Sequence, residues 1–225
     1  MGNKMFPFIT DTVNPIAGGP CPFNCSYCWA TALKERHQWK KYRGEYRILE
    51  KELRIYPSGS FVFPFDMIDV GDPNISKPII RTVFSWMQSQ KEVNFLLLTK
   101  NPKFYRTYRE WMQPHIYAGV TIESDIIPLK FSKAPHPHDR ADEMNFLRTV
   151  SPDIHRFVSI EPIMKFTHNF RNHIVWIKPD FVAIGYDNYN NGLPEPSLEE
   201  TEELINDISN SGIKVYRKTI RDKVN

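Results

Sequence analysis

The chain has 225 residues, a formal net charge of +3 and an apolar fraction of 41%. This length and apolar content suit a well-formed core, and we expect a single α/β domain over residues 1–225. No run approaches the ~18 apolar residues of a membrane span, and the N-terminus lacks the apolar core of a signal peptide. We therefore expect a cytoplasmic protein without membrane contact. An odd count of three cysteines argues against a disulfide framework.

All three cysteines lie in one short stretch, residues 14–30, which reads NPIAGGPCPFNCSYCWA. Cys21, Cys25 and Cys28 have the spacing C-x3-C-x2-C, and two glycines and a proline open the cysteine loop at residues 18–29. Thiolates this close together can converge on one soft metal centre. A structural zinc ion and a closed four-iron cluster each take four protein ligands. Three cysteines leave one position open, which is what a catalytic centre requires.

Buried strands and amphipathic helices alternate along the rest of the chain. Strands are expected before the cysteines and at residues 60–65, 93–98, 116–120, 156–160, 181–184 and 213–216. Helices are expected at residues 29–42, from Pro78, around Phe104, at residues 140–150, and from a capping box at Ser197 and Glu200 to a stop at Gly212. Such alternation predicts parallel βαβ units. About six to seven strands are too few for a full eight-stranded barrel, so we expect a partial (β/α) barrel.

Polar residues gather where the predicted strands end. The carboxyl ends of barrel strands form the rim that builds active sites. The cysteine loop follows the first strand, so it is expected on the same rim. Strand-end polar residues also cap the helices that follow, which is the alternative interpretation. The polar residues in question are Asp66, Thr99, Lys100, Glu123, Ser159, Glu161 and Asp187.

The cysteine spacing, with Tyr27 just before the third cysteine, resembles the radical S-adenosylmethionine (SAM) signature. The later words FPFD, LLLTKNP, YAGVTIES, FVSIEP and FVAIGYD extend the likeness over about residues 14–218. Together they resemble a phage- and prokaryote-associated three-cysteine radical SAM family of unsettled function, distantly similar to spore photoproduct lyase-like proteins. The resemblance implies a [4Fe-4S] cluster on Cys21, Cys25 and Cys28. SAM would chelate the fourth iron and be cleaved reductively to a 5'-deoxyadenosyl radical, with flavodoxin or ferredoxin as reductant.

The resemblance also implies roles for the strand-end residues. Asp66 is expected to receive the amino group of SAM, because a carboxylate pairs with an ammonium group. The chain has GYDNYNNG where the family has a glycine-rich GGESG ending, so the substrate stays open. The other cofactor-binding candidates are Thr99 and Lys100 for the carboxylate or ribose of SAM, Thr121 and Glu123 for the ribose hydroxyls, and Ser159 and Glu161 for the adenine or the substrate.

Two segments are rich in basic side chains. Residues 33–56 hold eight Lys and Arg against four Glu, interleaved with aromatic residues, and the tail at 213–225 holds five against one Asp. This pattern favours a nucleic acid or nucleotide substrate, whereas a solvated helix face and a frayed tail are the alternative. A peptide or small molecule is a second substrate hypothesis. An iron–sulfur electron carrier, or a zinc-binding interaction protein whose site one of the seven histidines completes, is a third possibility.

Overall fold

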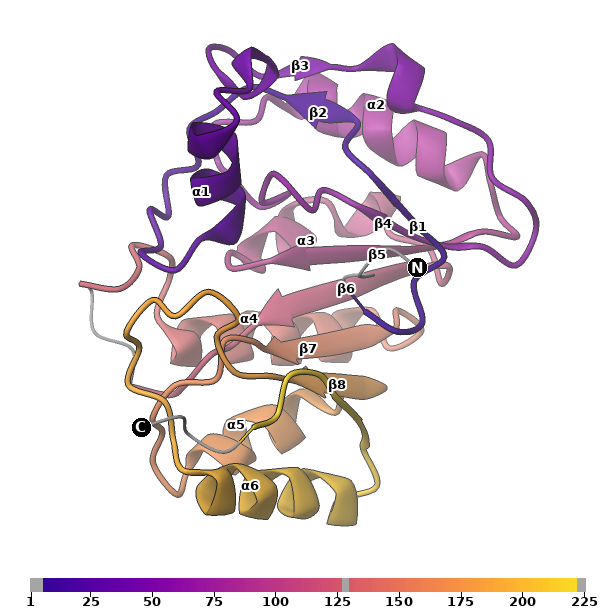
Figure 1. Ribbon diagram of the computed structural model, residues 1–225. Coiled ribbons are helices and arrows are strands. Elements are labelled where there is room, and N and C mark those ends of the chain that lie inside the picture. The colour runs from indigo at the N-terminus through magenta and orange to yellow at the C-terminus, as the bar shows by residue number, and fades with distance from the viewer. Residues whose placement is uncertain (1–5, 127–129, 222–225) are drawn as a thin grey trace.

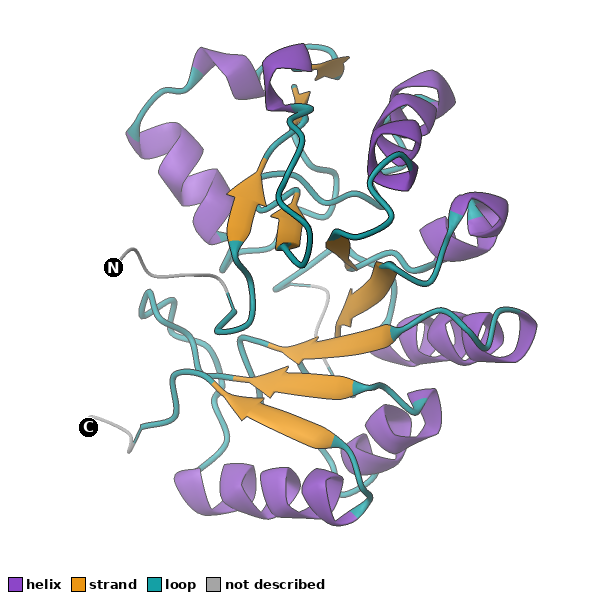
Figure 2. Ribbon diagram, turned by 90° about the vertical axis from the view of Figure 1, so that its right-hand side faces the viewer, coloured by secondary structure: helices purple, strands orange, loops and turns teal. Residues whose placement is uncertain are grey.

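The computed structural model describes residues 6–126 and 130–221. Seven strands form one sheet in the order β1-β4-β5-β6-β7-β8-β9, and every neighbouring pair is parallel. The sheet curls into a half-barrel (Figures 1 and 2), which confirms the predicted partial (β/α) barrel. Its strands are β1 (Asp11–Val13), β4 (Phe61–Pro64), β5 (Asn94–Thr99), β6 (Ile116–Thr121), β7 (Arg156–Ile160), β8 (Phe181–Ile184) and β9 (Lys214–Arg217).

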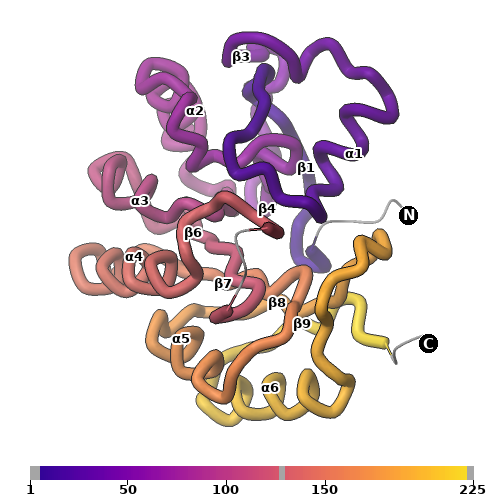
Figure 3. Tube along the Cα trace, turned by 90° about the vertical axis from the view of Figure 1, so that its left-hand side faces the viewer, coloured from indigo at the N-terminus to yellow at the C-terminus, as the bar shows by residue number. Residues whose placement is uncertain are grey.

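Helices cover the convex face of this sheet (Figure 3). In α2, Pro78 lies in the first turn, where its missing N–H costs no hydrogen bond, and Val83 and Met87 fall on the buried face. The predicted capping box of Ser197 and Glu200 is present at the start of α6. The covering helices are α2 (Lys77–Gln88), α3 (Lys103–Thr107) with the 3-10 turn η3 (Arg109–Trp111), α4 (Pro137–Val150), α5 (Phe170–Ile177) and α6 (Leu198–Asn210).

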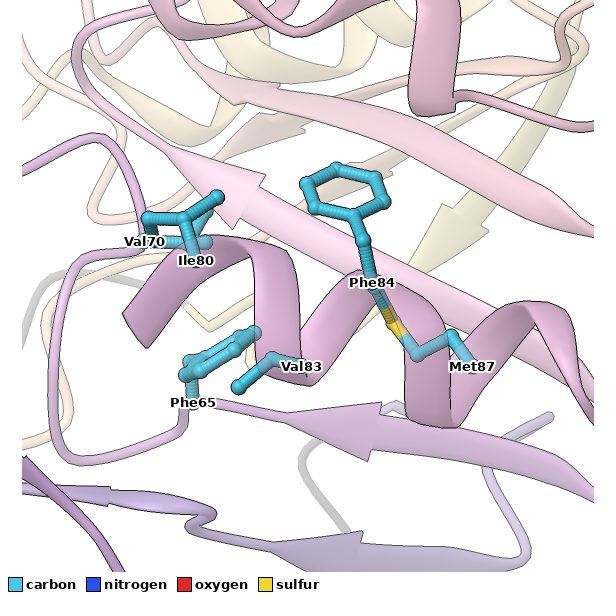
Figure 4. Close-up of a pocket in the computed structure, with 6 residues that line it drawn as sticks. All are labelled: Phe65, Val70, Ile80, Val83, Phe84 and Met87. Carbon is cyan, nitrogen blue, oxygen red and sulfur yellow. The ribbon is translucent and has the colours of Figure 1, made fainter. Parts of the chain in front are cut away.

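A small packing gap lies between α2 and the sheet (Figure 4). Every side chain around it is apolar, so it offers a ligand no polar group to recognise and belongs to the core. The lining residues are Phe65, Val70, Ile80, Val83, Phe84 and Met87.

A separate apolar cluster fills the concave side of the sheet. Because side chains alternate between the two faces of a strand, these residues face away from the helices. Phe6, which precedes β1, packs edge-on against Phe157 with 5.1 Å between ring centroids, and Phe8 lies 4.8 Å from Phe181. The N-terminal segment therefore closes the barrel interior from the amino side. The buried cluster members are Phe6, Ile9, Phe63, Leu96, Phe157, Phe181 and Ala183.

The segment around the cysteines differs from the expected single helix at residues 29–42. Helix α1 (Trp29–Arg36) stops early, because Gln38 adopts a left-handed conformation with φ of 48°. The 3-10 turn η1 (Lys40–Tyr42) follows, then strand β3 (Arg47–Ile48), which pairs antiparallel with β2 (Ile16–Ala17), and the turn η2 (Glu50–Glu52). Two-residue strands have no usable periodicity, so the sequence did not predict this ribbon. No helix in residues 6–126 and 130–221 is long and apolar enough to cross a bilayer.

Candidate cofactor site

The cysteine loop runs from β2 to α1 at the carboxyl end of the sheet, the side that faces the viewer in Figure 3. Gly18 and Gly19 adopt φ values of 114° and 135°, which residues other than glycine rarely adopt. Their N–H groups donate to the carbonyls of Lys41 at 3.0 Å and Gly44 at 3.1 Å. A Cβ atom on Gly18 would lie 2.5 Å from the carbonyl oxygen of Glu45. The two glycines thus allow residues 41–45 to pack closely against the start of the cysteine loop.

The three cysteines are free and partly buried. The Sγ atom of Cys25 lies 3.1 Å from the hydroxyl of Ser132. Cys28 is the N-cap of α1, and its sulfur accepts a hydrogen bond from the N–H of Thr31 at 3.4 Å. The pKa of Cys21 is raised to about 12, mainly by burial and to a lesser degree by the nearby carboxylates of Asp69 and Asp72. Metal binding must therefore displace protons from buried thiols.

This donor set fits an iron–sulfur cluster in ligand type and number. The thiols lie near one another along the loop. Burial is the main cause of the raised pKa of both Cys21 and Cys25, and the charge of the next cysteine along the chain adds to each rise. Among the described residues, no three His, Cys, Asp or Glu side chains are already arranged to hold a metal ion.

Glu123, which follows β6, lies at the centre of a buried polar cluster. Its side chain has no solvent exposure. The hydroxyl of Tyr27 donates to Oε1 at 2.6 Å, Lys100 pairs with the same oxygen, and Arg140 pairs with Oε2 at 2.7 Å. Burial opposes ionisation of Glu123, but the two cations outweigh it and hold its pKa below the usual range. Both oxygens are thus engaged within the protein, and the predicted contact of Glu123 with ribose stays a prediction.

Thr99 and the backbone of Lys100 bind a carboxylate that sequence reasoning missed. The Thr99 hydroxyl donates to Oδ1 of Asp69, and the Lys100 N–H donates to Oδ2 at 2.9 Å. Thr99 is only 1% exposed, so this contact accounts for its hydroxyl. The available signal was the run of Asp66, Asp69 and Asp72, in which acidic residues recur every three positions after a buried strand.

Asp66 lies on the rim beside β1 and the basic segment. The side-chain amide of Asn14 donates to its Oδ1, while the Asn14 oxygen accepts from the N–H of Met67 at 3.0 Å. Burial raises the pKa of Asp66, and the amide of Asn14 and the charges of Lys41 and Lys34 oppose the rise. The carboxylate is therefore held in place by Asn14 while cationic side chains remain close to it.

The remaining predicted residues lie further along the sheet. Thr121 and Ser159 are register partners on β6 and β7, and both are buried. Glu161 pairs with Lys218, and both side chains keep about 15% exposure. Asp187 binds the loop that follows it, accepting from the N–H of Tyr189 at 3.0 Å.

The structure thus joins Lys100 to Glu123 and Thr121 to Ser159, while Asp66 and Glu161 belong to separate sets of contacts.

The two basic segments differ in the structure. In the described part of the tail, Arg217 pairs with Glu202, Lys218 with Glu161 and Arg221 with Glu195, so acidic partners offset these three charges. The first segment stays open to solvent beside α1. It is formed by the exposed residues Arg36, His37, Trp39, Lys40, Lys41 and Arg43.

The aromatic rings of the open segment carry some of its cations. Trp39 is 36% exposed, and its ring stacks on His37 with 5.2 Å between centroids. The ammonium of Lys41 lies 5.8 Å from the centroid of the same ring and 4.8 Å from that of Tyr42. Positive charge and an accessible aromatic face therefore lie next to each other near the cysteine loop.

By fold, this is an α/β protein with a parallel half-barrel sheet, and its cysteine loop and buried ion pairs lie at the carboxyl-end rim. Residues 4–185 match the family described as "Protein of unknown function (DUF5131)", and the chain belongs to that family. No curated protein matches the chain.

Among solved structures, the chain is similar to a variant of spore photoproduct lyase with bound AdoMet and dinucleoside spore photoproduct. The TM-score is 0.62 at 10% identity, over 92% of this chain and 76% of that one. Another structure, of spore photoproduct lyase complexed with dinucleoside spore photoproduct, gives a TM-score of 0.60 at 10% identity, over 90% of this chain and 75% of that one. At this identity the likeness establishes the fold.

Proposed function

We propose that this protein is a radical SAM enzyme in which Cys21, Cys25 and Cys28 hold a [4Fe-4S] cluster. The observation that carries the proposal is a loop with three free cysteines and no fourth, attached through Tyr27 to the carboxyl-end rim of a partial barrel. The fold shared with spore photoproduct lyase, one structure of which binds AdoMet, supports it. When bound, the cluster and SAM supply an electron and a 5'-deoxyadenosyl radical that abstracts hydrogen from a substrate carbon.

In this proposal the chain binds SAM through the rim. Asp66 receives the amino group, and Asn14 fixes the orientation of its carboxylate. Lys100, whose side chain keeps 16% exposure, attracts the SAM carboxylate from its position beside Glu123. Thr99 acts indirectly, because its hydroxyl positions Asp69. Thr121 contacts the ribose hydroxyls of SAM. Ser159 and Glu161 contact the adenine or the substrate.

The interior of the half-barrel keeps solvent away from the reacting centre. The packing of Phe6 against Phe63 and Phe157 fills the interior on the amino side, away from the rim where SAM would bind. Exclusion of water protects a reactive radical from side reactions. We treat residues 1–225 as one domain, because β8 and β9 continue the same sheet to Arg217, beyond the family match at 185.

Anaerobic reconstitution with iron and sulfide tests the cluster and SAM assignments together. We expect about four irons per chain, SAM binding at equilibrium, and loss of the cluster in Cys25→Ala. Asp66→Asn should weaken SAM binding about tenfold while the iron content stays unchanged. Asp207→Asn, on the exposed side of α6, is the matched control and should bind SAM like the wild type. Zinc uptake without a four-iron cluster, or a cluster without SAM affinity, would favour an interaction protein or electron carrier instead.

We further propose a nucleic acid or nucleotide as the substrate, with flavodoxin or ferredoxin as reductant. The open basic segment with Trp39 and Lys41 beside the cysteine loop supports this substrate, and the complex of spore photoproduct lyase with a dinucleoside agrees with it. Binding that relies on phosphate contacts weakens steeply as salt rises. We expect such a slope for DNA or RNA, and a smaller one for Lys40→Ala with Lys41→Ala. Affinity without a salt slope would favour a peptide or small molecule.

A further inference from the structure

A short segment far along the chain pairs with the cysteine loop. Residues 131–135, which we call the clasp, lie just before α4. The N–H of Ser26 donates to the carbonyl of Phe131 at 2.9 Å, and the N–H of Lys133 donates to that of Phe23 at 2.7 Å. Ser132 lies between these two bonds, with its hydroxyl 3.1 Å from Cys25 Sγ. The clasp therefore presents one hydroxyl to the middle cysteine.

The surroundings of Ser132 set the direction of that hydrogen bond. Its Oγ already accepts a hydrogen bond from the N–H of Ala134 at 3.1 Å, while its own proton remains available. A metal-bound thiolate has no proton and can only accept. Ser132 is 4% exposed, so bulk water does not compete for its hydroxyl. In the loaded protein Ser132 is thus the donor and Cys25 the acceptor.

A network of buried hydrogen bonds connects the clasp to the cysteine loop and holds it in place. Arg140, at the start of α4 and 1% exposed, donates from Nε to the carbonyl of Pro135 at 2.6 Å. The same guanidinium binds the Thr121 carbonyl at 2.8 Å and Oε2 of Glu123 at 2.7 Å. Glu123 in turn accepts from Tyr27, which is two residues from Cys25 in the loop. The hydroxyl is therefore preorganised by buried groups on both sides.

The three sulfur atoms have unequal surroundings. Cys28 accepts a backbone N–H, and Cys21 is near the carboxylates of Asp69 and Asp72. Cys25 instead faces the hydroxyl of Ser132 from a distant part of the chain. Reduction of a cluster adds negative charge that spreads onto its sulfur ligands, and hydrogen bonds to those ligands stabilise the reduced form.

We propose that Ser132 is a positioning residue that donates a hydrogen bond to the Cys25 thiolate and thereby raises the reduction potential of the cluster. This inference rests on the proposed function. It gives the clasp a specific role: the segment makes the cluster easier to reduce, and so easier for the physiological reductant to load with an electron.

The test compares reduction potentials of reconstituted proteins, titrated without SAM and followed by electron paramagnetic resonance. Ser132→Ala should lower the ratio of reduced to oxidised cluster at a fixed potential about tenfold, which corresponds to ~59 mV for one electron. Ser132→Thr keeps the hydroxyl and should stay near the wild type. Ser124→Ala is the matched control, because Ser124 also lies buried between β6 and α4 but donates to the Lys165 carbonyl. It should leave the potential unchanged.

The outcomes separate the inference from the proposed function. The resonance signal reports only the cluster-bearing fraction, so partial loading of Ser132→Ala does not obscure its potential. An assembled cluster with the same potential in Ser132→Ala and wild type overturns the role of Ser132 and leaves the proposed function intact. A wild-type chain that assembles no four-iron cluster overturns both.

Discussion

The hydroxyl of Tyr27 lies 2.6 Å from Oε1 of Glu123, a contact that spans 96 positions of the chain and joins the cysteine loop to the end of β6. The same carboxylate binds Lys100 and Arg140, so one buried anion is balanced by two cations. Buried networks of this kind are costly when one member is removed, because the others remain buried without their partner. Glu123 is therefore one of the groups that attach the cysteine loop to the barrel.

Glu123→Gln should lower the free energy of unfolding of the cluster-free protein by about 3–5 kcal/mol, since it leaves two cations without their buried counter-charge. Urea denaturation measures the change. Glu143→Gln is the matched control, because Glu143 pairs with Arg106 at 2.8 Å on the surface. It should cost about 0–1 kcal/mol. Equal, small losses in both variants would show that the Glu123 cluster does not stabilise the fold.

The contribution of Glu123 to stability should depend on pH. Its folded-state pKa lies below the ordinary value of 4.5, so the unfolded chain binds a proton there before the folded chain does. The stabilisation is complete above about pH 4.5 and is lost as the pH falls further. Burial raises the pKa of Asp66 and Asp69, which favours the folded state on acidification, so the wild type alone is a poor guide.

The useful quantity is the difference in unfolding free energy between wild type and Glu123→Gln. It should be constant from about pH 7 to pH 5 and shrink toward pH 3. Urea denaturation at each pH provides it. A difference that stays constant over this range would mean that the folded-state pKa of Glu123 is not depressed.

Gly18→Ala should prevent the cysteine loop from seating on the following segment. The new Cβ would lie 2.5 Å from the carbonyl oxygen of Glu45, where only backbone movement can relieve the overlap. Gly59→Ala is the matched control, because Gly59 also has a positive φ, 80°, but has nothing within 4 Å of such a Cβ. We expect Gly59→Ala to cost about 1 kcal/mol of stability with normal iron content, and Gly18→Ala to lose most of its iron.

Thr99→Val removes the hydroxyl that binds Asp69 while keeping the shape of the side chain. Because the partner is a buried carboxylate, the loss should be about 2 kcal/mol in the free energy of unfolding. Thr107→Val is the control, since the Thr107 hydroxyl donates to the Lys103 carbonyl on the exposed side of α3. It should change stability by about 0.5 kcal/mol at most. Indistinguishable variants would contradict the role assigned to Asp69.

Much of the fold was predictable because the strands are buried runs with clear ends. The predicted bounds of β7 and β8 match the structure, and the capping box at Ser197 is present. Helix α5 was not predicted, although its buried residues Phe170, Ile174 and Ile177 have helical spacing. Its N-cap Asn169 makes no side-chain capping bond, and the helix is short, so the local signal was weak.

The strand ends also predicted which polar residues gather at the rim, but not the contacts that these residues make. Parallel strands bring Lys100 and Glu123 to one edge, and the structure puts them in contact. Ser132 carries no local signal, because its partner Cys25 is 107 positions away. The buried Arg140 was equally hidden, since arginine on a helix normally faces solvent. Such contacts depend on how the whole chain folds, so a local pattern cannot reveal them.

The most direct test of the central proposal is the formation of 5'-deoxyadenosine. The protein is reconstituted anaerobically with iron and sulfide, reduced, and incubated with SAM in the presence and absence of short DNA and RNA strands. Chromatography with mass spectrometry then measures the product, and Cys25→Ala provides the background. We predict 5'-deoxyadenosine from the native chain and none above background from Cys25→Ala. A native protein that carries a reducible four-iron cluster and binds SAM, yet never exceeds that background, would contradict the radical SAM assignment.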